Sequence, residues 1–249
     1  MTAIELVVLD MAGTTVRDDG VVEQAFQRAA ERTGVADRMP WADALQHVRD
    51  TMGQSKIEVF THLAGGDRAA AERATAAFEA AYDEIIAEQG AEEIPGARLA
   101  IEQLKEAGLT VALTTGFAPV TRDALLDALG WRDLVDIALS PVDAGRGRPH
   151  PDLVLTALLR SGASSVQSVA VVGDTASDVL SGRRAGAGFV AGVLSGAHDE
   201  TAILAAGADA ALPSIAALRD ALSARGLLAS DAAPVASASV VHTPPVPVS

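Results

Sequence analysis

Short apolar runs bounded by turn residues recur along the chain, and their spacing predicts buried strands. The runs are Ile4 to Leu9, Leu109 to Thr114, Val135 to Leu139, Ser168 to Val172 and Phe189 to Val193. Continuous apolar runs of this length are typical of parallel strands that are covered on both faces. We therefore predict a sheet of parallel strands with helices on both sides.

Helical patterns lie between several of these apolar runs. They occupy Gly96 to Ala107, Val120 to Leu129 and Asp152 to Ser161, and a glycine follows each of them. Regular alternation of strands and helices is the pattern of a doubly wound α/β fold. We therefore expect a Rossmann-like parallel sheet.

One long interval interrupts this alternation. From about residue 21 to 90 there is no strand-like run, only helical stretches that include Ala69 to Gln89. This predicts a helical cap domain inserted after the first strand, with the cap at 19–91 and the catalytic core at 1–18 and 92–228. Residues 229–249 are rich in Ala, Ser, Pro and Val and have few large side chains, so we expect this tail to be disordered.

The amino-acid composition limits which binding partners and which cellular location we expect. The 249 residues are 49% hydrophobic, which is ample for a buried core, and the net charge of −14 disfavours nucleic acid and anionic membranes as partners. The absence of Cys excludes disulfides and thiolate metal sites. No stretch approaches the ~20 apolar residues that a membrane helix needs. We expect a cytoplasmic protein.

Carboxylates follow two of the predicted strands. Asp10 comes directly after the first apolar run, and Asp174 and Asp178 follow the run that ends at Val172. An isolated Asp in such a place is usually part of a turn or a helix cap. Because parallel strands end at the same edge of a sheet, where ligands bind, these side chains are expected to converge. Converging carboxylates favour a Mg²⁺ site over a helix cap for Asp174.

Two further strand-end loops carry groups that bind phosphate. Thr115 and Gly116 follow the run at Leu109 to Thr114, and they offer a hydroxyl and backbone N–H groups to a phosphoryl oxygen. Arg148 lies in a proline-stiffened loop and offers a planar fork that can bind two phosphoryl oxygens. Each motif alone is weak evidence for phosphate binding, because such sequences usually form turns. The evidence comes from the order in which all of these motifs follow successive strands.

Together these motifs resemble the haloacid dehalogenase superfamily over nearly all of residues 1 to 225. The shared pattern is Asp-x-x-Gly-Thr from Asp10, Thr after the second strand, a basic residue in the third loop, and Gly-Asp-x-x-x-Asp ending at Asp178. The resemblance implies that Asp10 attacks phosphorus and becomes an aspartyl-phosphate. It implies these site residues: Asp10, the Ala12 backbone carbonyl and Asp174 as Mg²⁺ ligands, Asp178 in the outer shell, and Thr115, Gly116 and Arg148 at the phosphoryl oxygens.

Ala12 and Lys56 bear on which bond is broken. Ordinary phosphatases of this superfamily have a second Asp where this chain has Ala12, and loss of such an acid typically costs 10²–10⁴-fold in rate. A plain phosphate ester is therefore a poor match. Lys56 is one of only two lysines, and it falls in the first turn of a predicted helix. An amine can form a Schiff base, whereas Arg cannot.

The combination resembles the phosphonatase branch, the phosphonoacetaldehyde hydrolases. Asp10 to Thr15, Met52 to Lys56 and Arg148 match its motifs. The resemblance implies that Lys56 forms a Schiff base with a carbonyl phosphonate before the C–P bond breaks, that Met52 and Phe117 support the site, and that the cap forms a homodimer. The chain departs from the branch at Val59, where the branch has His, at Phe117, where it has Tyr, and in lacking Cys, so we expect phosphonoacetaldehyde or a relative as substrate.

Three other functions remain open on the sequence alone. The nearest is a phosphomonoesterase that acts on a small phosphorylated metabolite. A haloacid dehalogenase also lacks the second Asp, but Arg148 and Asp174 suit it less well. A non-catalytic phosphate sensor would not need the nucleophile Asp10. The histidines show no metal-ligand spacing, and we interpret them as structural or surface residues, with His150 the one to revisit because it lies beside Arg148: His47, His62, His150, His198 and His242.

Overall fold

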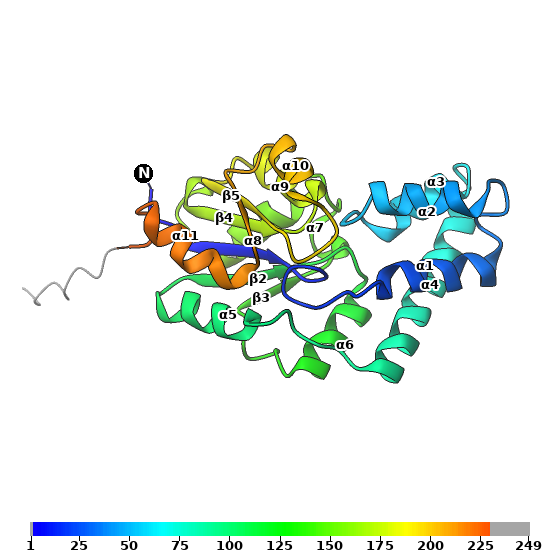
Figure 1. Ribbon diagram of the computed structural model, residues 1–249, viewed down its shortest axis with the longest axis horizontal. Helices are drawn as coiled ribbons and strands as arrows, with labels where there is room; N and C mark the ends of the chain where they lie inside the picture. The colour runs from blue at the N-terminus through cyan, green and yellow to red at the C-terminus, as the bar shows by residue number, and fades with distance from the viewer. Residues whose placement is uncertain (1, 230–249) are drawn as a thin grey trace, which may run out of the picture.

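The computed structural model describes residues 2–229 and contains a six-stranded sheet in which every pair of neighbouring strands is parallel (Figure 1). The strand order is β3-β2-β1-β4-β5-β6. The prediction of a doubly wound parallel sheet is confirmed. The strands are β1 (Leu6–Asp10), β2 (Thr110–Thr114), β3 (Ile137–Leu139), β4 (Val169–Gly173), β5 (Phe189–Val193) and β6 (Ala210–Leu212).

Strand β1 lies in the middle of the sheet, and its register sets the position of the site. Asp10 pairs with Thr114 of β2, and Leu9 pairs with Val172 of β4. The carboxyl ends of the three strands therefore lie side by side. Residues that follow β2 and β4 in the sequence lie next to Asp10 as a result.

Both faces of the sheet are buried, which explains why the strands are apolar throughout. Val7 and Leu9 of β1 pack in one apolar cluster, and Leu6 and Val8 pack in a second. Helices and short 3₁₀ turns cover the two faces. They are α5 (Ala97–Glu106), α6 (Pro119–Leu129), α7 (Pro141–Ala144), α8 (Asp152–Ser161), η1 (Val166–Ser168), α9 (Ala176–Ala185), α10 (Glu200–Ala205), η2 (Ile215–Ala217) and α11 (Leu218–Ala224).

Four helices between β1 and α5 lie beyond the carboxyl edge of the sheet (Figure 1). They are α1 (Val21–Thr33), α2 (Trp41–Asp50), α3 (Lys56–Leu63) and α4 (Arg68–Gln89), and we refer to them as the cap helices. Phe26 of α1 packs against Phe60 and Phe78, with ring centroids 4.8 and 4.7 Å apart. These aromatic rings belong to the same apolar cluster as Val7 and Leu9 of the sheet, while the domain boundaries at 18/19 and 91/92 stay a prediction.

The two segments that join the cap helices to the core are hydrogen-bonded to each other. The Arg17 N–H donates to the Glu92 carbonyl at 2.8 Å, and the Ile94 N–H donates to the Thr15 carbonyl at 2.9 Å. The chain therefore leaves the core and returns to it at neighbouring points.

The sequence pattern failed to predict β6. This strand has only three residues, two of them alanine, so it forms no apolar run that stands out from its surroundings. The predicted disorder of the tail at 229–249 lies outside the described residues apart from 229. Across the part of the chain that the structure describes, no helix has both the length and the apolar character to cross a membrane.

Candidate active site

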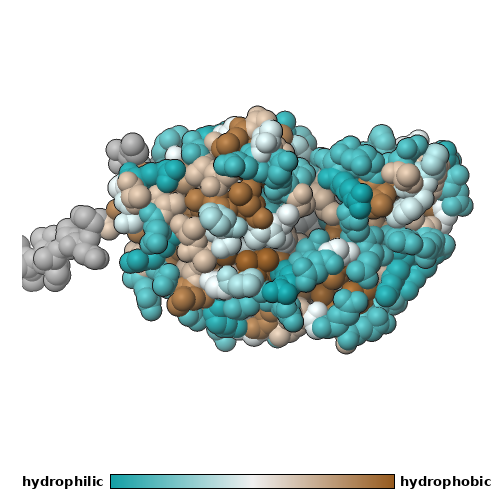
Figure 2. Space-filling model, viewed as in Figure 1, coloured by the Kyte–Doolittle hydropathy of each residue, from teal (hydrophilic) through white to brown (hydrophobic). Residues whose placement is uncertain are grey.

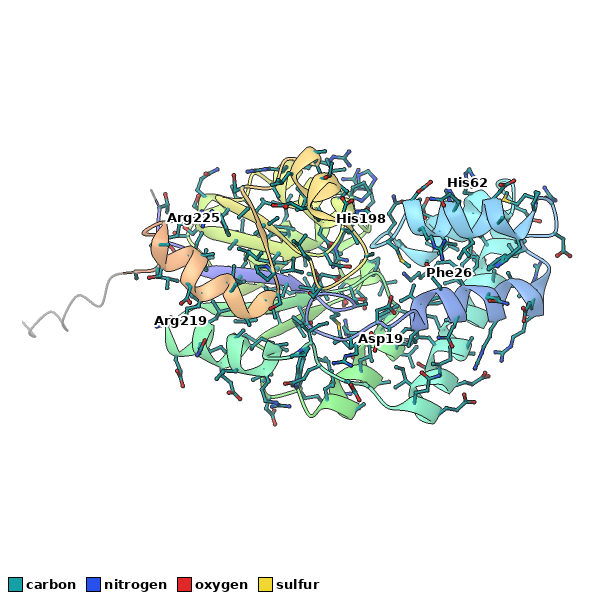
Figure 3. The ribbon with its side chains drawn as sticks, in the orientation of Figure 1. Asp19, Phe26, His62, His198, Arg219 and Arg225 are labelled. Atoms are coloured by element: carbon teal, nitrogen blue, oxygen red, sulfur yellow. The ribbon has the colours of Figure 1, made fainter. Side chains whose placement is uncertain are left out.

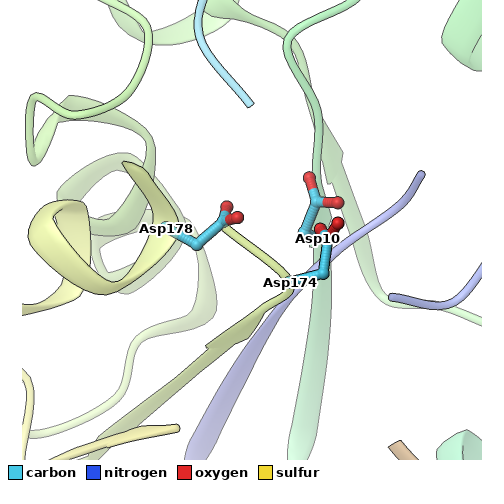
Figure 4. A group of neighbouring side chains, drawn as sticks. All are labelled: Asp10, Asp174 and Asp178. Atoms are coloured by element: carbon cyan, nitrogen blue, oxygen red, sulfur yellow. The ribbon is translucent and has the colours of Figure 1, made fainter. Parts of the chain in front are cut away.

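Three buried carboxylates converge at the carboxyl ends of β1 and β4 (Figure 4). Each of Asp10, Asp174 and Asp178 offers an oxygen, and these oxygens lie within 4.8 Å of one another. The Ala197 N–H donates to Asp174 Oδ2 at 2.8 Å, and the Thr14 hydroxyl donates to its Oδ1 at 3.2 Å. Loops from both ends of the chain therefore orient the Asp174 carboxylate.

Thr175 and Asp178, rather than Asp174, cap helix α9. Thr175 is the N-cap residue, and Asp178 Oδ2 accepts hydrogen bonds from the Thr175 N–H at 3.1 Å and the Thr175 hydroxyl at 2.5 Å. This reciprocal capping box satisfies backbone donors at the helix start. It also leaves Asp178 Oδ1 free to contact other groups in the site.

The carboxylates repel one another in a site shielded from water. Burial raises the pKa of Asp10 well above its usual range, and the charges of Asp178 and Asp174 add to the rise, while Arg148 opposes it. Burial and the charge of Asp178 raise the pKa of Asp174 to about 7. A bound cation would relieve this repulsion, and the oxygen donors are of the type that Mg²⁺ binds. The residues present therefore fit a divalent metal.

Arg148 lies between the carboxylates as their counter-ion. Its Nη1 is 2.6 Å from Asp10 Oδ1, and its Nε is 2.8 Å from Asp178 Oδ1. Its Nη2 donates to the Thr114 hydroxyl at 2.7 Å. All three nitrogens of the guanidinium thus contact the protein here, and the binding of phosphoryl oxygens by Arg148 stays a prediction.

The loop after β2 differs in one respect from the expectation. The Thr115 N–H donates to the Leu139 carbonyl at 3.1 Å, so it is not available to a phosphoryl oxygen as we expected. The Thr115 hydroxyl accepts the Phe117 N–H at 3.2 Å and keeps its own hydrogen to donate. A Cβ at Gly116 would lie 2.6 Å from the Gln54 carbonyl oxygen, so glycine permits close approach of the cap.

Lys56 is buried at the first position of α3. Its Nζ lies 5.4 Å from the ring centroids of Phe26 and Phe78 and 5.1 Å from that of Phe117. Burial lowers the pKa of Lys56, although the carboxylates of Glu79, Asp18 and Asp10 act in the opposite direction. The amine is therefore less basic than an exposed lysine.

Nearly all the predicted site residues line one small cavity of about 30 Å³. A cleft of about 790 Å³ adjoins it and shares Asp18, Met52, Asp174 and Ala197 with its lining. Figure 2 shows the surface hollowed between the core and the cap helices. Asp178 does not line the small cavity, but its carboxylate forms an ion pair with Arg148, which does. The predicted residues that line the small cavity are Asp10, Ala12, Met52, Lys56, Thr115, Gly116, Phe117, Arg148 and Asp174.

Comparison with known families agrees with this arrangement. A model of the haloacid dehalogenase-like hydrolases matches residues 4–186. The chain belongs to this family. The family predicted from the sequence motifs is therefore confirmed for this hydrolase.

Relatives of the hydrolase include a probable phosphatase and several phosphonoacetaldehyde hydrolases. It is 30% identical to a probable phosphatase, IndB, from Dickeya dadantii, with 81% of this chain and 86% of the relative covered. It is 29% identical to phosphonoacetaldehyde hydrolase from Bacillus cereus, with coverage of 79% and 78%. Among solved structures, a hydrolase from Pseudomonas syringae is 25% identical with a TM-score of 0.76, covering 88% of this chain and 98% of that one. A phosphonoacetaldehyde hydrolase-like protein from Oleispira antarctica shares the fold at 23% identity and a TM-score of 0.77, with coverage of 90% and 94%.

Sequence reasoning missed two carboxylates near Lys56. Asp18 follows the first motif, and nothing in the sequence distinguishes it from its neighbour Asp19. Glu79 had a detectable signal, since it lies three residues before Tyr82 on the largely apolar, buried side of α4. The burial of a lone carboxylate on such a face indicates a polar partner.

Among residues 2–229, no histidine belongs to a cluster of potential metal ligands. The rings of His47 and His62 stack in the cap helices with centroids 3.8 Å apart. His198 lies on the core side of the junction, across from Asp19 on the first linker (Figure 3), and its Nδ1 accepts the Ala176 N–H at 2.9 Å. The His150 carbonyl accepts the Ser181 hydroxyl at 2.7 Å. His242 lies outside the described residues.

Proposed function

We propose that this hydrolase cleaves the C–P bond of a carbonyl phosphonate, either phosphonoacetaldehyde or a relative. The observation that carries the proposal is a buried amine and a strand-end carboxylate, Lys56 and Asp10, that line the same small cavity. Ala12 supports it, because a phosphate ester would find no acid at that position for its departing alcohol.

The first step in this proposal takes place at Lys56. The neutral amine adds to the substrate carbonyl, and loss of water leaves an iminium bound to the lysine. The lowered pKa of Lys56, which burial causes, increases the fraction of neutral amine. The rings of Phe26, Phe78 and Phe117 exclude water from the iminium.

The second step takes place at Asp10. Its carboxylate attacks phosphorus, and the C–P bonding electrons move into a carbon–carbon double bond while the iminium nitrogen accepts the displaced pair. An enamine therefore departs in place of an unstable carbanion. Water then hydrolyses the aspartyl-phosphate, and a second water releases the product carbonyl from Lys56. Arg148, whose Nη1 lies 2.6 Å from Asp10 Oδ1, is positioned to stabilise charge on the phosphoryl oxygens.

A divalent metal belongs to the same proposal. Asp10, the Ala12 carbonyl and Asp174 would hold Mg²⁺, with Asp178 in the outer shell. When bound, the ion would neutralise part of the charge on the phosphoryl group. The cluster supports this assignment because Arg148 supplies one positive charge against three carboxylates.

Phosphomonoester hydrolysis is the second candidate function. The similarity to a probable phosphatase from Dickeya dadantii favours it. In this alternative Lys56 acts only as a cation that attracts the substrate. The two candidates therefore differ in whether the amine becomes covalently bound.

Borohydride trapping separates the two functions. With phosphonoacetaldehyde, borohydride should reduce the iminium to a stable amine, inactivate the protein and add mass to Lys56 but not to Lys105. Lys56→Arg keeps the charge and should lose both the adduct and phosphate release. Asp10→Asn should still form the adduct but release no phosphate. An unmodified wild-type protein that hydrolyses phosphate esters, with activity retained in Lys56→Arg, would favour the phosphatase.

A further inference from the structure

Iminium formation at Lys56 requires a partner that carries protons. The ammonium must lose a proton before the amine can attack, and the hydroxyl of the resulting carbinolamine must gain one before it leaves as water. Two buried or part-buried carboxylates, Glu79 and Asp18, act on the charge of Lys56. The hydrogen bonds of these two carboxylates differ.

Both oxygens of the Glu79 carboxylate accept structural hydrogen bonds. Its Oε1 accepts the Ala118 N–H at 3.1 Å, and its Oε2 accepts the hydroxyl of Thr121. These bonds join cap helix α4 to the start of core helix α6. Glu79 therefore holds the cap against the core, and both of its oxygens are engaged in that role.

Only one oxygen of the Asp18 carboxylate accepts a hydrogen bond within the described residues. Its Oδ1 accepts the Val22 N–H at 2.9 Å, while its Oδ2 makes no hydrogen bond within residues 2–229. Asp18 lines the small cavity together with Lys56 and Asp10, and it also lines the large cleft beside it. Asp18 is therefore in contact with both the cavity that holds Lys56 and the open cleft next to it.

The surroundings of Asp18 suit exchange of a proton. Burial raises the pKa of Asp18, and the Val22 N–H and the charge of Lys56 oppose that rise. The negative charges of Glu23 and Asp19 raise the pKa of Asp18 further. The phenol of Tyr82 lies close enough that the charge of Asp18 acts on it. A carboxyl group in this setting holds a proton more readily than an exposed aspartate does.

We propose that Asp18 transfers protons for Lys56 during iminium formation, an inference that rests on the proposed C–P cleavage. The Asp18 carboxylate accepts a proton from the Lys56 ammonium, and the neutral amine adds to the substrate carbonyl. The Asp18 carboxyl then protonates the carbinolamine hydroxyl, which leaves as water. The Asp18 carboxylate is regenerated, and the net reaction converts ammonium and carbonyl to iminium and water.

A purely structural role makes a different prediction. Asp18 Oδ1 binds the Val22 N–H in the first turn of α1, a role that Asn fills equally well. Asp18→Asn therefore preserves this bond and removes the titrating group. Asp19→Asn is a matched control, because Asp19 is adjacent and also acidic, but its side chain is 72% exposed and pairs loosely with Arg17 at 3.7 Å.

The experiment measures the rate of borohydride-trapped adduct on Lys56, with phosphonoacetaldehyde as the probe, alongside phosphate release. Asp18→Asn should slow both by about 10²–10⁴-fold, with an unchanged thermal midpoint, and should shift the acidic limb of the pH–rate profile for adduct formation, a step in which the Asp10 nucleophile takes no part. Asp19→Asn should stay within about twofold of wild type. Asp18→Ser, whose hydroxyl oxygen is also a hydrogen-bond acceptor, provides the same comparison if the Asn variant is unstable.

The outcomes separate this inference from the proposed function. An Asp18→Asn protein that forms the adduct at the wild-type rate overturns the role of Asp18 and leaves C–P cleavage intact. A wild-type protein that forms no adduct at all overturns both. Equal losses in Asp18→Asn and Asp19→Asn would indicate a general charge effect and also overturn the inference.

Discussion

At the scale of single residues, the surroundings of Lys56 are a compromise between burial and charge. Three aromatic rings within 5.4 Å of its Nζ remove water from the amine, which disfavours the ammonium form. The carboxylates of Glu79 and Asp18 favour the ammonium form. Burial outweighs them, so Lys56 loses its proton at lower pH than a free lysine.

This balance predicts a measurable titration. The hydrolase has only two lysines, Lys56 and Lys105, so protein labelled with ¹³C at lysine gives two resolvable Cε signals. The Lys56 signal should shift with a midpoint below 10.5, the ordinary pKa of a lysine side chain. The pKa falls because the folded state disfavours the charged form, so the neutral amine appears earlier as pH rises.

The Lys56→Arg variant assigns the two signals, since only the Lys105 signal should remain. Lys105 Nζ donates to the Leu134 carbonyl at 2.9 Å and lies 2.9 Å from Asp136 Oδ1, which makes it a suitable internal reference in an ion pair. A Lys56 midpoint at or above 10.5 would contradict the dominance of burial.

Which carboxylates enter the site was only partly predictable. Asp10 and Asp174 could be identified because each follows an apolar strand, and strand ends fix their positions. Asp18 and Asp19 could not be told apart. The linker turns sharply at Asp19 and Gly20, with φ of 40° and 82°, and this turn decides which carboxylate faces the cavity. Such a turn has no hydrophobic period to reveal it.

At the scale of elements, strands were predictable from apolar runs and loop contacts were not. The predicted strand at Phe189 to Val193 matches β5, and the predicted helix at Asp152 to Ser161 matches α8. The approach of the cap loop to Gly116 depends on how two distant segments pack. Nothing local to either segment encodes that contact.

Two glycine substitutions should separate function from stability. A Cβ at Gly116 would lie 2.6 Å from the Gln54 carbonyl oxygen, so Gly116→Ala pushes the cap loop away from the core. We expect at least a tenfold loss of kcat/KM, since small misplacements in a site are costly. The thermal midpoint should change little, because the clash lies at the boundary between cap and core.

Gly182→Ala is the contrasting substitution. Its Cβ would lie 2.9 Å from Val171 Cβ and 3.0 Å from Val190 Cγ2, inside the core beneath α9. Overpacking costs about 1–3 kcal/mol, and the gain in helix propensity of about 1 kcal/mol offsets part of it. The thermal midpoint should fall by a few degrees while kcat/KM stays near wild type. The reverse pattern in the two variants would contradict this assignment of roles.

At the scale of the whole molecule, negative charge is concentrated where a cation is expected. The chain carries a net charge of −14, and three carboxylates meet at the site. Chelation of divalent metal should abolish phosphate release, and added Mg²⁺ should restore it. Because Mg²⁺ would bind the folded state, it should raise the free energy of unfolding by about 2.7 kcal/mol at a concentration 100 times its Kd. The thermal midpoint should rise as a result.

Asp174→Ala tests whether the effect arises at this site. The variant should lose both the metal-dependent turnover and the thermal shift, whereas a distant surface change such as Asp67→Asn should lose neither, although it alters the N-cap of α4. Full activity of the wild-type protein in excess chelator would rule out the metal.

The paired linkers between core and cap have a consequence for how such a protein can vary in evolution. Because the Arg17 and Ile94 N–H groups bind carbonyls of the opposite linker, the insertion enters and leaves through one narrow neck. The pairing of β1 with β2 and β4 does not depend on what lies beyond that neck. An ancestral gene could therefore exchange, lengthen or discard the whole insertion in one recombination event without disturbing the sheet. Selection for a new substrate can then act on the cap helices while the strand-end carboxylates of the core are inherited unchanged.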